Sequence, residues 1–397
     1  MTGIDPLRKA RRVACAFPDN GGALSNLANH LRRGDQLGEA LSWSCWAVRP
    51  EAWPQGQIDP RAYRVQAETL VDLGRFAEAD AVYRRLDPDG SMPVVQWSRS
   101  RALMGLEDWP QAWALAEQRF RLEELPVAAL APPHWQGWPT VRNLQVWDEQ
   151  GFGDSLQALR WLPAALNRVE RLHLHVRPPL VSLLRQGLAW LGPRLTISDR
   201  QQLSSDTVQQ QCHGSLLSLP VLLGAQNLAP GHVLRLPRPD GERAPGLRVG
   251  LVWESGRYLN DDFHSLEYRR KTLTPAARDQ LRLALERRGV ELVSLQLGDA
   301  AVPDGADFLQ QAQALLSCHL LLTVDTAAAH LAGALDFPTW LMLPWSAASR
   351  FQRGRSTTPL YRSLRLFRQS RPGDWDGVVQ ELLQHLDQRR TAGLLPA

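Results

Sequence analysis

The sequence has few lysines, few cysteines and no long apolar run. Two of its 45 basic residues are lysines, Lys9 and Lys271, and the rest are arginines. The four cysteines form no CxxC pair, so neither a disulfide framework nor a zinc site is predicted. No stretch approaches the ~20 apolar residues of a membrane-spanning helix, and residues 1–17 contain no apolar core of a secretion signal. We therefore expect a cytoplasmic protein.

The composition is that of a globular protein with several domains. The chain has 397 residues, of which 44% are hydrophobic and 22% charged. At roughly 150 residues per domain, two or three domains are expected. The net charge is +4, but the arginines are spread along the chain among acidic residues. A basic face that binds nucleic acid is therefore not predicted.

The first third of the chain has the pattern of helical repeats. Apolar residues recur at helical spacing between Leu24 and Leu125, and prolines interrupt the pattern. Three similar segments end in Ala40, Ala79 and Ala112, which are 39 and 33 residues apart. This spacing is close to the ~34-residue tetratricopeptide period. We predict a domain of tetratricopeptide-like helical repeats over residues 1–130. Gly34 and Gly74 would lie at the turns of the first two repeats, and Glu107 takes the corresponding position in the third.

Beyond the proline-rich residues 126–139, strands and helices alternate. Two further domains are predicted, 140–240 and 246–388, separated by a linker rich in Pro, Gly and Arg. Runs as apolar as residues 319–324 and 339–343 are typical of parallel strands that helices cover on both faces. Two such doubly wound, Rossmann-like domains leave a ligand site between the carboxyl ends of their sheets. The predicted strands are 144–147, 172–176, 195–197, 247–253, 290–296, 319–324, 339–343 and 364–367, and the predicted helices are 155–166, 180–191, 275–287, 310–317, 326–335 and 375–386.

A glycine loop follows the first predicted strand. Gly151 and Gly153 would let the backbone approach a ligand, and Asp154 would stand at the edge of the cleft. The alternative is that Asp154 and Gln157 form a capping box at the start of a helix. Leu156 occupies the third glycine position of a dinucleotide fingerprint, which disfavours a nicotinamide enzyme.

A second candidate segment runs from Thr323 to Ala334, where a buried strand turns directly into a helix of small residues. The free amides and positive dipole at Thr326–Ala328 would accept a diphosphate. The alternatives are that Asp325 caps this helix and that His330 is a core histidine.

Together, the segments Glu-Gln-Gly-Phe-Gly-Asp-Ser-Leu-Gln and Val-Asp-Thr-Ala-Ala-Ala-His-Leu-Ala-Gly-Ala resemble the heptosyltransferase-like glycosyltransferases of family nine. Leu366-Phe-Arg-Gln and Pro372-Gly-Asp-Trp add to this resemblance, which covers about residues 140–388. The version fused to N-terminal tetratricopeptide repeats is the most similar. The resemblance implies a GT-B fold, a nucleotide-diphosphate sugar as donor, inversion at the anomeric carbon, and no cofactor or catalytic metal.

The resemblance also implies roles for particular residues. Asp154 matches the motif aspartate and is the candidate general base, with Glu149 as the alternative. The candidate donor-binding residues are Asp325, Thr326, Ala327, His330, Arg270, Lys271 and Arg350. The cluster at residues 269–271 is equally consistent with a solvated surface. The two Asp-x-Asp segments, 87–89 and 374–376, do not follow strands, so no metal site is predicted.

One departure from the family leaves a second function open. Where relatives commonly have an Ala-Gly-Asn-like loop after the strand 247–253, this chain has a loop that begins with Glu254. Glu254 would bring negative charge near the phosphates of the donor. The alternative is thus a non-catalytic interaction scaffold with a degenerate transferase domain. For an enzyme, the acceptor would be a glycan, a lipid-linked saccharide or a protein, and the repeats would bind the acceptor or a protein partner. ADP-heptose is the donor that the resemblance suggests.

Overall fold

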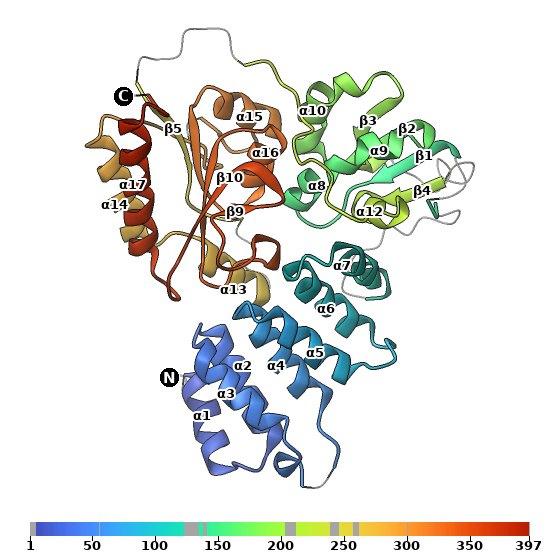
Figure 1. Ribbon diagram of the computed structural model, residues 1–397, viewed down its shortest axis with the longest axis vertical. Coiled ribbons are helices and arrows are strands. Elements are labelled where there is room, and N and C mark those ends of the chain that lie inside the picture. The colour runs from blue at the N-terminus through green and yellow to red at the C-terminus, as the bar shows by residue number, and fades with distance from the viewer. Residues whose placement is uncertain are drawn as a thin grey trace. The chain divides into compact units, whose positions relative to one another are not determined.

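The computed structural model describes residues 5–54, 56–122, 135–137, 141–202, 212–238, 246–256, 262–299 and 301–396. The chain divides into two compact units (Figure 1). The helical unit comprises Met1–Val127 and Ser346–Arg353. The α/β unit comprises Ala128–Trp345 and Gly354–Ala397. N-terminal helices are therefore followed by an α/β fold, as the sequence predicts.

The helical unit is built from helix hairpins. Its alanines Ala40, Ala79 and Ala112 are completely buried, which lets neighbouring helices approach closely. The first helix precedes Leu24, where the helical pattern of the sequence begins. The pairs α2–α3, α4–α5 and α6–α7 pack as hairpins, and the helices are α1 Pro6–Ala16, α2 Gly21–Arg33, α3 Leu37–Ala47, α4 Pro60–Asp72, α5 Phe76–Leu86, α6 Pro93–Gly105 and α7 Trp109–Ala116.

The three hairpins share one turn geometry. Asp35, Gly74 and Glu107 have φ values of 58°, 72° and 61°, the left-handed region that glycine adopts most easily. Gly34 has φ −91°, so the left-handed residue of the first turn is its neighbour. The amide after each left-handed residue donates to a leucine carbonyl five residues earlier: Gln36 to Leu31, Arg75 to Leu70 and Asp108 to Leu103. The three turns are thus geometrically equivalent, while the assignment of the hairpins as tetratricopeptide repeats stays a prediction.

The first sheet of the α/β unit has four parallel strands in the order β3-β2-β1-β4. Trp147 at the end of β1 pairs with His175 and Ser215 near the ends of its neighbours, so the carboxyl ends of these strands meet at one edge. The strands are β1 Val141–Trp147, β2 Val169–Val176, β3 Leu195–Asp199 and β4 Cys212–Ser215; the helices are α8 Phe152–Ala158, α9 Leu162–Leu166, α10 Pro178–Gly187 and α12 Leu219–Leu222.

The second sheet has six strands in the order β6-β5-β7-β8-β10-β9, all parallel except β9. Every residue of β7 and β8 is buried, which accounts for their continuous apolar sequences. The strands are β5 Arg248–Val252, β6 Glu291–Ser294, β7 Leu320–Val324, β8 Thr339–Leu343, β9 Thr357–Thr358 and β10 Tyr361–Arg368.

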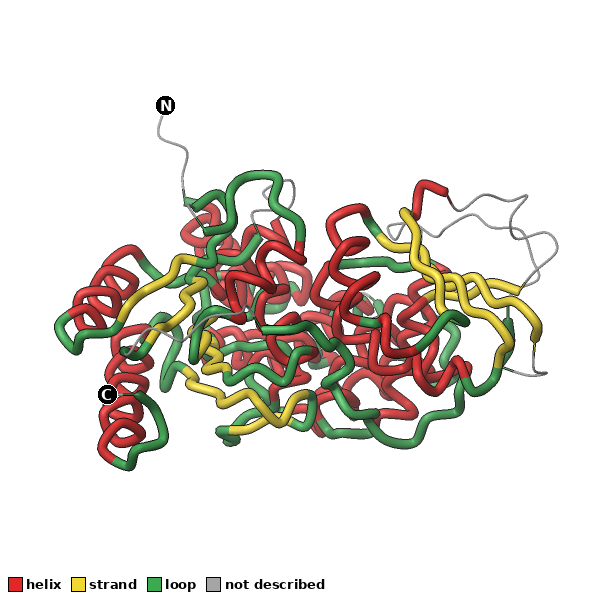
Figure 2. The backbone as a smooth tube through the Cα atoms, turned by 90° about the horizontal axis from the view of Figure 1, so that it is seen from above, coloured by secondary structure: helices red, strands yellow, loops and turns green. Residues whose placement is uncertain are grey.

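Helices cover both faces of the six-stranded sheet (Figure 2). Leu281 of α14 and Leu382 of α17 belong to one hydrophobic cluster, whereas Leu315 of α15 and Ala332 of α16 belong to another. The helices are α13 Asp262–Lys271, α14 Pro275–Glu286, α15 Phe308–Leu316, α16 Ala327–Ala334 and α17 Trp375–Thr391. None of the described helices is long and apolar enough to cross a bilayer.

One segment after β8 belongs to the helical unit. The 3-10 turn η7, Ser349–Phe351, packs against α6, and the Phe351 side chain is completely buried. Arg353 donates from Nη2 to the carbonyl of Asp72 at 3.3 Å. The chain therefore leaves the α/β unit between β8 and β9 and returns after Arg353.

The predicted strands and helices correspond to observed ones, with two kinds of difference. The predicted helix 155–166 is divided into α8, the 3-10 turn η3 (Leu159–Trp161) and α9, and it begins at Phe152. The strands β4 and β9 and the helices α12 and α13 have no counterpart in the prediction. The domain boundaries 1–130, 140–240 and 246–388 stay predictions, because residues 140–240 and 246–388 lie mostly within one compact unit.

Candidate functional site

The glycine loop lies between β1 and α8. Gln150 has φ 57°, and Gly151 is the residue before the first turn of α8. Asp154 lies within this turn and is half-buried. Its Oδ2 accepts a hydrogen bond from the Gly151 amide at 3.2 Å. Asp154 thus has the capping role that the alternative gave it, but as the third residue of the helix and with Gly151 instead of Gln157 as its partner, because the helix starts earlier. An acidic group in the first turn is favoured by the helix dipole.

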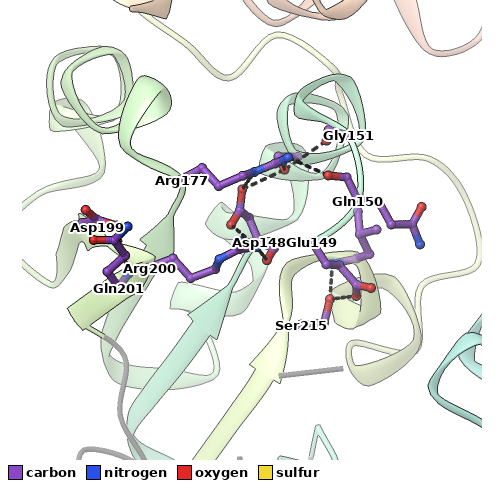
Figure 3. A network of polar contacts seen from close by, with 11 residues as sticks. Asp148, Glu149, Gln150, Gly151, Arg177, Asp199, Arg200, Gln201 and Ser215 are labelled. Atoms are coloured by element: carbon purple, nitrogen blue, oxygen red, sulfur yellow. Dashed lines mark hydrogen bonds and ion pairs between the residues drawn. The ribbon is translucent and has the colours of Figure 1, made fainter. Parts of the chain in front are cut away.

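An ion network occupies the carboxyl edge of the four-stranded sheet (Figure 3). Asp148 follows β1 and its side chain is 0% exposed. Arg177, which follows β2, donates from Nε to Asp148 Oδ2 at 2.8 Å. Arg200, which follows β3, donates from Nη1 to the Asp148 carbonyl at 3.0 Å and to Oδ1 at 3.3 Å. Sequence reasoning missed these three residues, although each directly follows a strand.

Glu149 is held in a different way. It is 8% exposed, and it accepts a short hydrogen bond from the hydroxyl of Ser215 at the end of β4 (Figure 3). The same hydroxyl accepts from the Leu217 amide at 3.0 Å. Glu149 is thus a buried carboxylate that is fixed at the centre of the sheet edge.

The second candidate segment has the predicted strand-to-helix geometry. β7 ends at Val324, and the Thr326 hydroxyl caps α16 by accepting from the Ala328 amide at 3.2 Å. The alternative that Asp325 caps the helix is therefore wrong. Asp325 is 5% exposed, and its Oδ2 lies 3.1 Å from Lys271 Nζ.

His330 has the surroundings of a core histidine. It is 2% exposed, its Nδ1 hydrogen-bonds the Tyr361 hydroxyl at 3.1 Å, and the two rings meet edge to face. This burial is compatible with a role at the site, because the ring lies only one turn from the start of α16.

The basic cluster forms the last turn of α13. Arg270 is 7% exposed, and the Lys271 side chain is 18% exposed. Of the three basic residues, only Arg269 belongs to a solvated surface. Lys271 Nζ lies 3.1 Å from Glu267 and 3.1 Å from Asp325. Two carboxylates thus neutralise the lysine that sequence reasoning assigned to the phosphates.

The structure brings the two candidate segments together. α8 packs against α16, and a Cβ atom at Gly153 would lie 2.8 Å from His330 Cδ2 and 3.7 Å from the Ala327 Cα. The neighbouring Phe152 ring lies 5.0 Å from that of Phe308 on α15. Glycine at 153 is therefore needed for this approach, and Asp154 is one residue away from it.

The remaining predicted residues are Arg350 and Glu254. Arg350 is in the segment that belongs to the helical unit, with its guanidinium 5.8 Å from the centre of the Phe351 ring. Glu254 follows β5 and accepts from the Tyr268 hydroxyl at 2.6 Å. No group of three His, Cys, Asp or Glu side chains suited to a metal occurs within the described ranges.

No known family profile matches the sequence, and no curated protein matches it. Similar solved structures include the iron-containing dodecameric glycosyltransferase TibC of enterotoxigenic E. coli H10407, with 15% identity, 60% of this chain and 66% of that chain covered, and a TM-score of 0.42. Another is the E. coli heptosyltransferase WaaC with ADP, with 12% identity, coverages of 62% and 99%, and a TM-score of 0.40. A third is the Thermobaculum terrenum O-GlcNAc transferase, with 13% identity, coverages of 98% and 89%, and a TM-score of 0.32. These values assign the chain to no family.

Proposed function

We propose that the chain is a cytoplasmic, inverting, metal-independent glycosyltransferase that moves a sugar from a nucleotide-diphosphate sugar to a hydroxyl acceptor. The observation that carries this proposal is the approach of Gly153 to Ala327 and His330. It brings the first turn of α8, which carries Asp154, close to the start of a helix whose sequence matches the donor motif. Such a helix end favours a diphosphate, and a nearby carboxylate can accept a proton.

The proposed reaction is a single displacement. Asp154 takes the proton of the acceptor hydroxyl while the oxygen of this hydroxyl forms a bond to the anomeric carbon of the donor sugar. The bond from this carbon to the diphosphate oxygen breaks, and its electron pair leaves with the nucleoside diphosphate. Because attack and departure occur on opposite faces, the configuration inverts.

The leaving diphosphate is assigned to the start of α16. The amides of Thr326 and Ala327 and the helix dipole would stabilise its charge. Asp325, His330, Arg270 and Lys271 would line this side, and Arg350 stays a further donor-side candidate. Glu149 is the alternative base.

The substrates follow from the resemblance of the two motifs. ADP-heptose is the first donor to test, and the acceptor is a glycan, a lipid-linked saccharide or a protein. The helical hairpins would engage the acceptor or a protein partner.

One observation favours the scaffold alternative. Lys271 is paired with both Glu267 and Asp325, and Glu254 is bonded to Tyr268 on the same helix as Lys271. The charge of Lys271, the cation that contacts Asp325 just before α16, is thus already compensated by two carboxylates, which disfavours a diphosphate there. In this alternative, the helical unit would recruit a protein and the α/β unit would have no turnover.

A nucleotide panel separates the two proposals. ADP, UDP, GDP, CDP and ADP-heptose are added to the full chain, and the thermal unfolding midpoint is measured. A ligand at 100 times its Kd stabilises by about 2.7 kcal/mol, so one member should raise the midpoint clearly. The transferase proposal would be abandoned if none did, and the scaffold would then be favoured.

Asp154→Asn tests the base. We expect donor turnover to fall about 10²- to 10⁴-fold, with the nucleotide-induced shift retained. Asp374→Asn is the matched control, because Asp374 also accepts from an amide at a helix start, that of Gly377 at 3.1 Å, but lies at α17. Unchanged turnover in Asp154→Asn, with turnover lost in Glu149→Gln, would transfer the role to Glu149.

A further inference from the structure

The turn between β1 and α8 is held from one side by a single guanidinium group. Arg177 donates from Nε to Asp148 Oδ2 at 2.8 Å, from Nη1 to the Gln150 carbonyl at 2.6 Å and from Nη2 to Ser155 Oγ at 3.0 Å. Its Cζ also lies 4.1 Å from the centre of the Phe152 ring. These contacts reach the beginning, the middle and the end of the turn (Figure 3).

The geometry requires an arginine rather than any cation. A guanidinium is a rigid planar fork that can donate in three directions and stack on an aromatic ring, whereas a lysine ammonium is a point charge. Lysine at position 177 would keep the charge opposite Asp148. It would not bond Gln150 and Ser155 together, nor stack on Phe152.

The backbone of the turn needs this support. Gln150 has φ 57°, a conformation that a residue with a side chain adopts at a cost. Its carbonyl is an acceptor for Arg177, so the bond opposes relaxation of the strained residue. Ser155 Oγ lies 3.3 Å from both Asp148 Oδ2 and the Gly151 carbonyl, which closes the network around the turn.

The contacts of Arg177 leave out the two candidate bases. None of its hydrogen bonds within the described residues reaches Glu149 or Asp154. Asp148, by contrast, is completely buried between Arg177 and Arg200, which makes it part of the support and removes it as a base. The guanidinium thus determines the path of the backbone that carries the acids without touching them.

We propose that Arg177 is a positioning residue, whose guanidinium holds the turn 148–155 so that Asp154 and Glu149 face the reacting groups. The role given to these two acids rests on the proposed function. The effect of Arg177 on the shape of the turn does not depend on that function, so the turn is tested separately.

The first test is hydrogen–deuterium exchange of Arg177→Lys without substrate. We expect amides in residues 150–156 to exchange at least ~10-fold faster than in the wild type, with the exchange of the six-stranded sheet unchanged. Arg185→Lys is the matched control, because exposed Arg185 in the same domain has one bond, to the Ile197 carbonyl at 3.0 Å. Unchanged exchange in the turn of Arg177→Lys would overturn the proposal.

Kinetics with ADP-heptose, or with the panel member that binds, give the second test. Arg177→Lys should lower kcat at least ~10-fold and change KM for the donor less than ~2-fold, because the donor side belongs to the other sheet. A general structural defect would change both constants, and this result would overturn the proposal. An inactive wild type would refute the transferase function but leave the exchange result standing.

Ser155→Ala keeps the inference testable if Arg177→Lys does not fold. This variant removes the Nη2 acceptor and retains the Asp148 pair. We expect a smaller acceleration of exchange, about 3-fold, in the same amides. No acceleration would count against Arg177 as the support of the turn.

Discussion

Replacing Arg160 with methionine is expected to loosen the packing between the two sheets of the α/β unit. Arg160 is 3% exposed and lies in η3, directly after α8. It donates from Nη1 to the Ala229 carbonyl at 3.2 Å and from Nη2 to the Leu360 carbonyl at 3.0 Å. Its guanidinium lies 4.9 Å from the centre of the Tyr361 ring at the start of β10. One side chain thus connects the four-stranded sheet's helices to the six-stranded sheet.

The expected loss can be estimated from these contacts. Methionine keeps the aliphatic stem and removes every donor. Three carbonyls lose a partner at about 1–3 kcal/mol each, because Nε also donates to the Gln157 carbonyl at 2.9 Å. The Tyr361 ring loses a cation contact of about 1 kcal/mol. Arg160 has no carboxylate partner among the described residues, so removing its buried charge offsets part of the loss. We expect the free energy of unfolding to fall by about 3 kcal/mol.

Urea unfolding followed by tryptophan fluorescence measures this change. Arg168→Met is the control, because Arg168 is exposed and makes one long bond, 3.5 Å to the Leu223 carbonyl; it should change stability by less than about 0.5 kcal/mol. A stability within about 0.5 kcal/mol of the wild type would refute the reasoning.

Two further predictions concern acid stability and the repeat turns. Burial, followed by the charge of His173, lowers the pKa of His175 below 6.5, so the unfolded chain takes up the proton first. The contribution of His175 is complete above pH 6.5 and is lost as pH falls toward the lower folded pKa, by up to about 1.4 kcal/mol per pH unit. His175→Gln should flatten this slope in urea titrations, and an unchanged slope would contradict the assignment. In the hairpins, Gly74→Ala should lower stability by at least about 0.5–1 kcal/mol, because Gly74 has φ 72° and an added Cβ would lie 2.9 Å from Arg353 Nε; an unchanged stability in urea unfolding would argue against strain at that turn.

Local pattern was sufficient to predict most elements. β7 and β8 consist of residues buried on both faces, so their apolar runs mark them without tertiary information. β4 has no such pattern, because Cys212–Ser215 is short, contains glycine and histidine, and is a strand only through pairing with β1. The turns show the same limit. Asp35 and Glu107 adopt the conformation that Gly74 marks in the sequence, because the hairpin packing imposes it.

The sequence predicted the local geometry of the two motifs but not the residues that support it. The glycine loop and the start of α16 could be placed because strand, turn and helix are contiguous there, while the roles of the residues in them stay predictions. Asp148, Arg177 and Arg200 are distant in sequence, and only the order β3-β2-β1-β4 brings their strand ends to one edge. The cap of α16 was misassigned for a related reason. Asp325 is a good capping residue, but its pairing with Lys271 leaves the role to Thr326.

Three acidic residues follow β1 within seven positions, and their different partners decide what each can do. The Asp148 side chain is 0% exposed and is held by two guanidinium groups, so a substrate hydroxyl cannot reach it. Glu149 is buried against Ser215, so a substrate hydroxyl would have to compete with that bond. Asp154 is half-buried, accepts from a backbone amide, and follows the residue that touches Ala327 and His330. Of the three, it combines access with nearness to the helix end assigned to the diphosphate, which is why the base is assigned to Asp154 first.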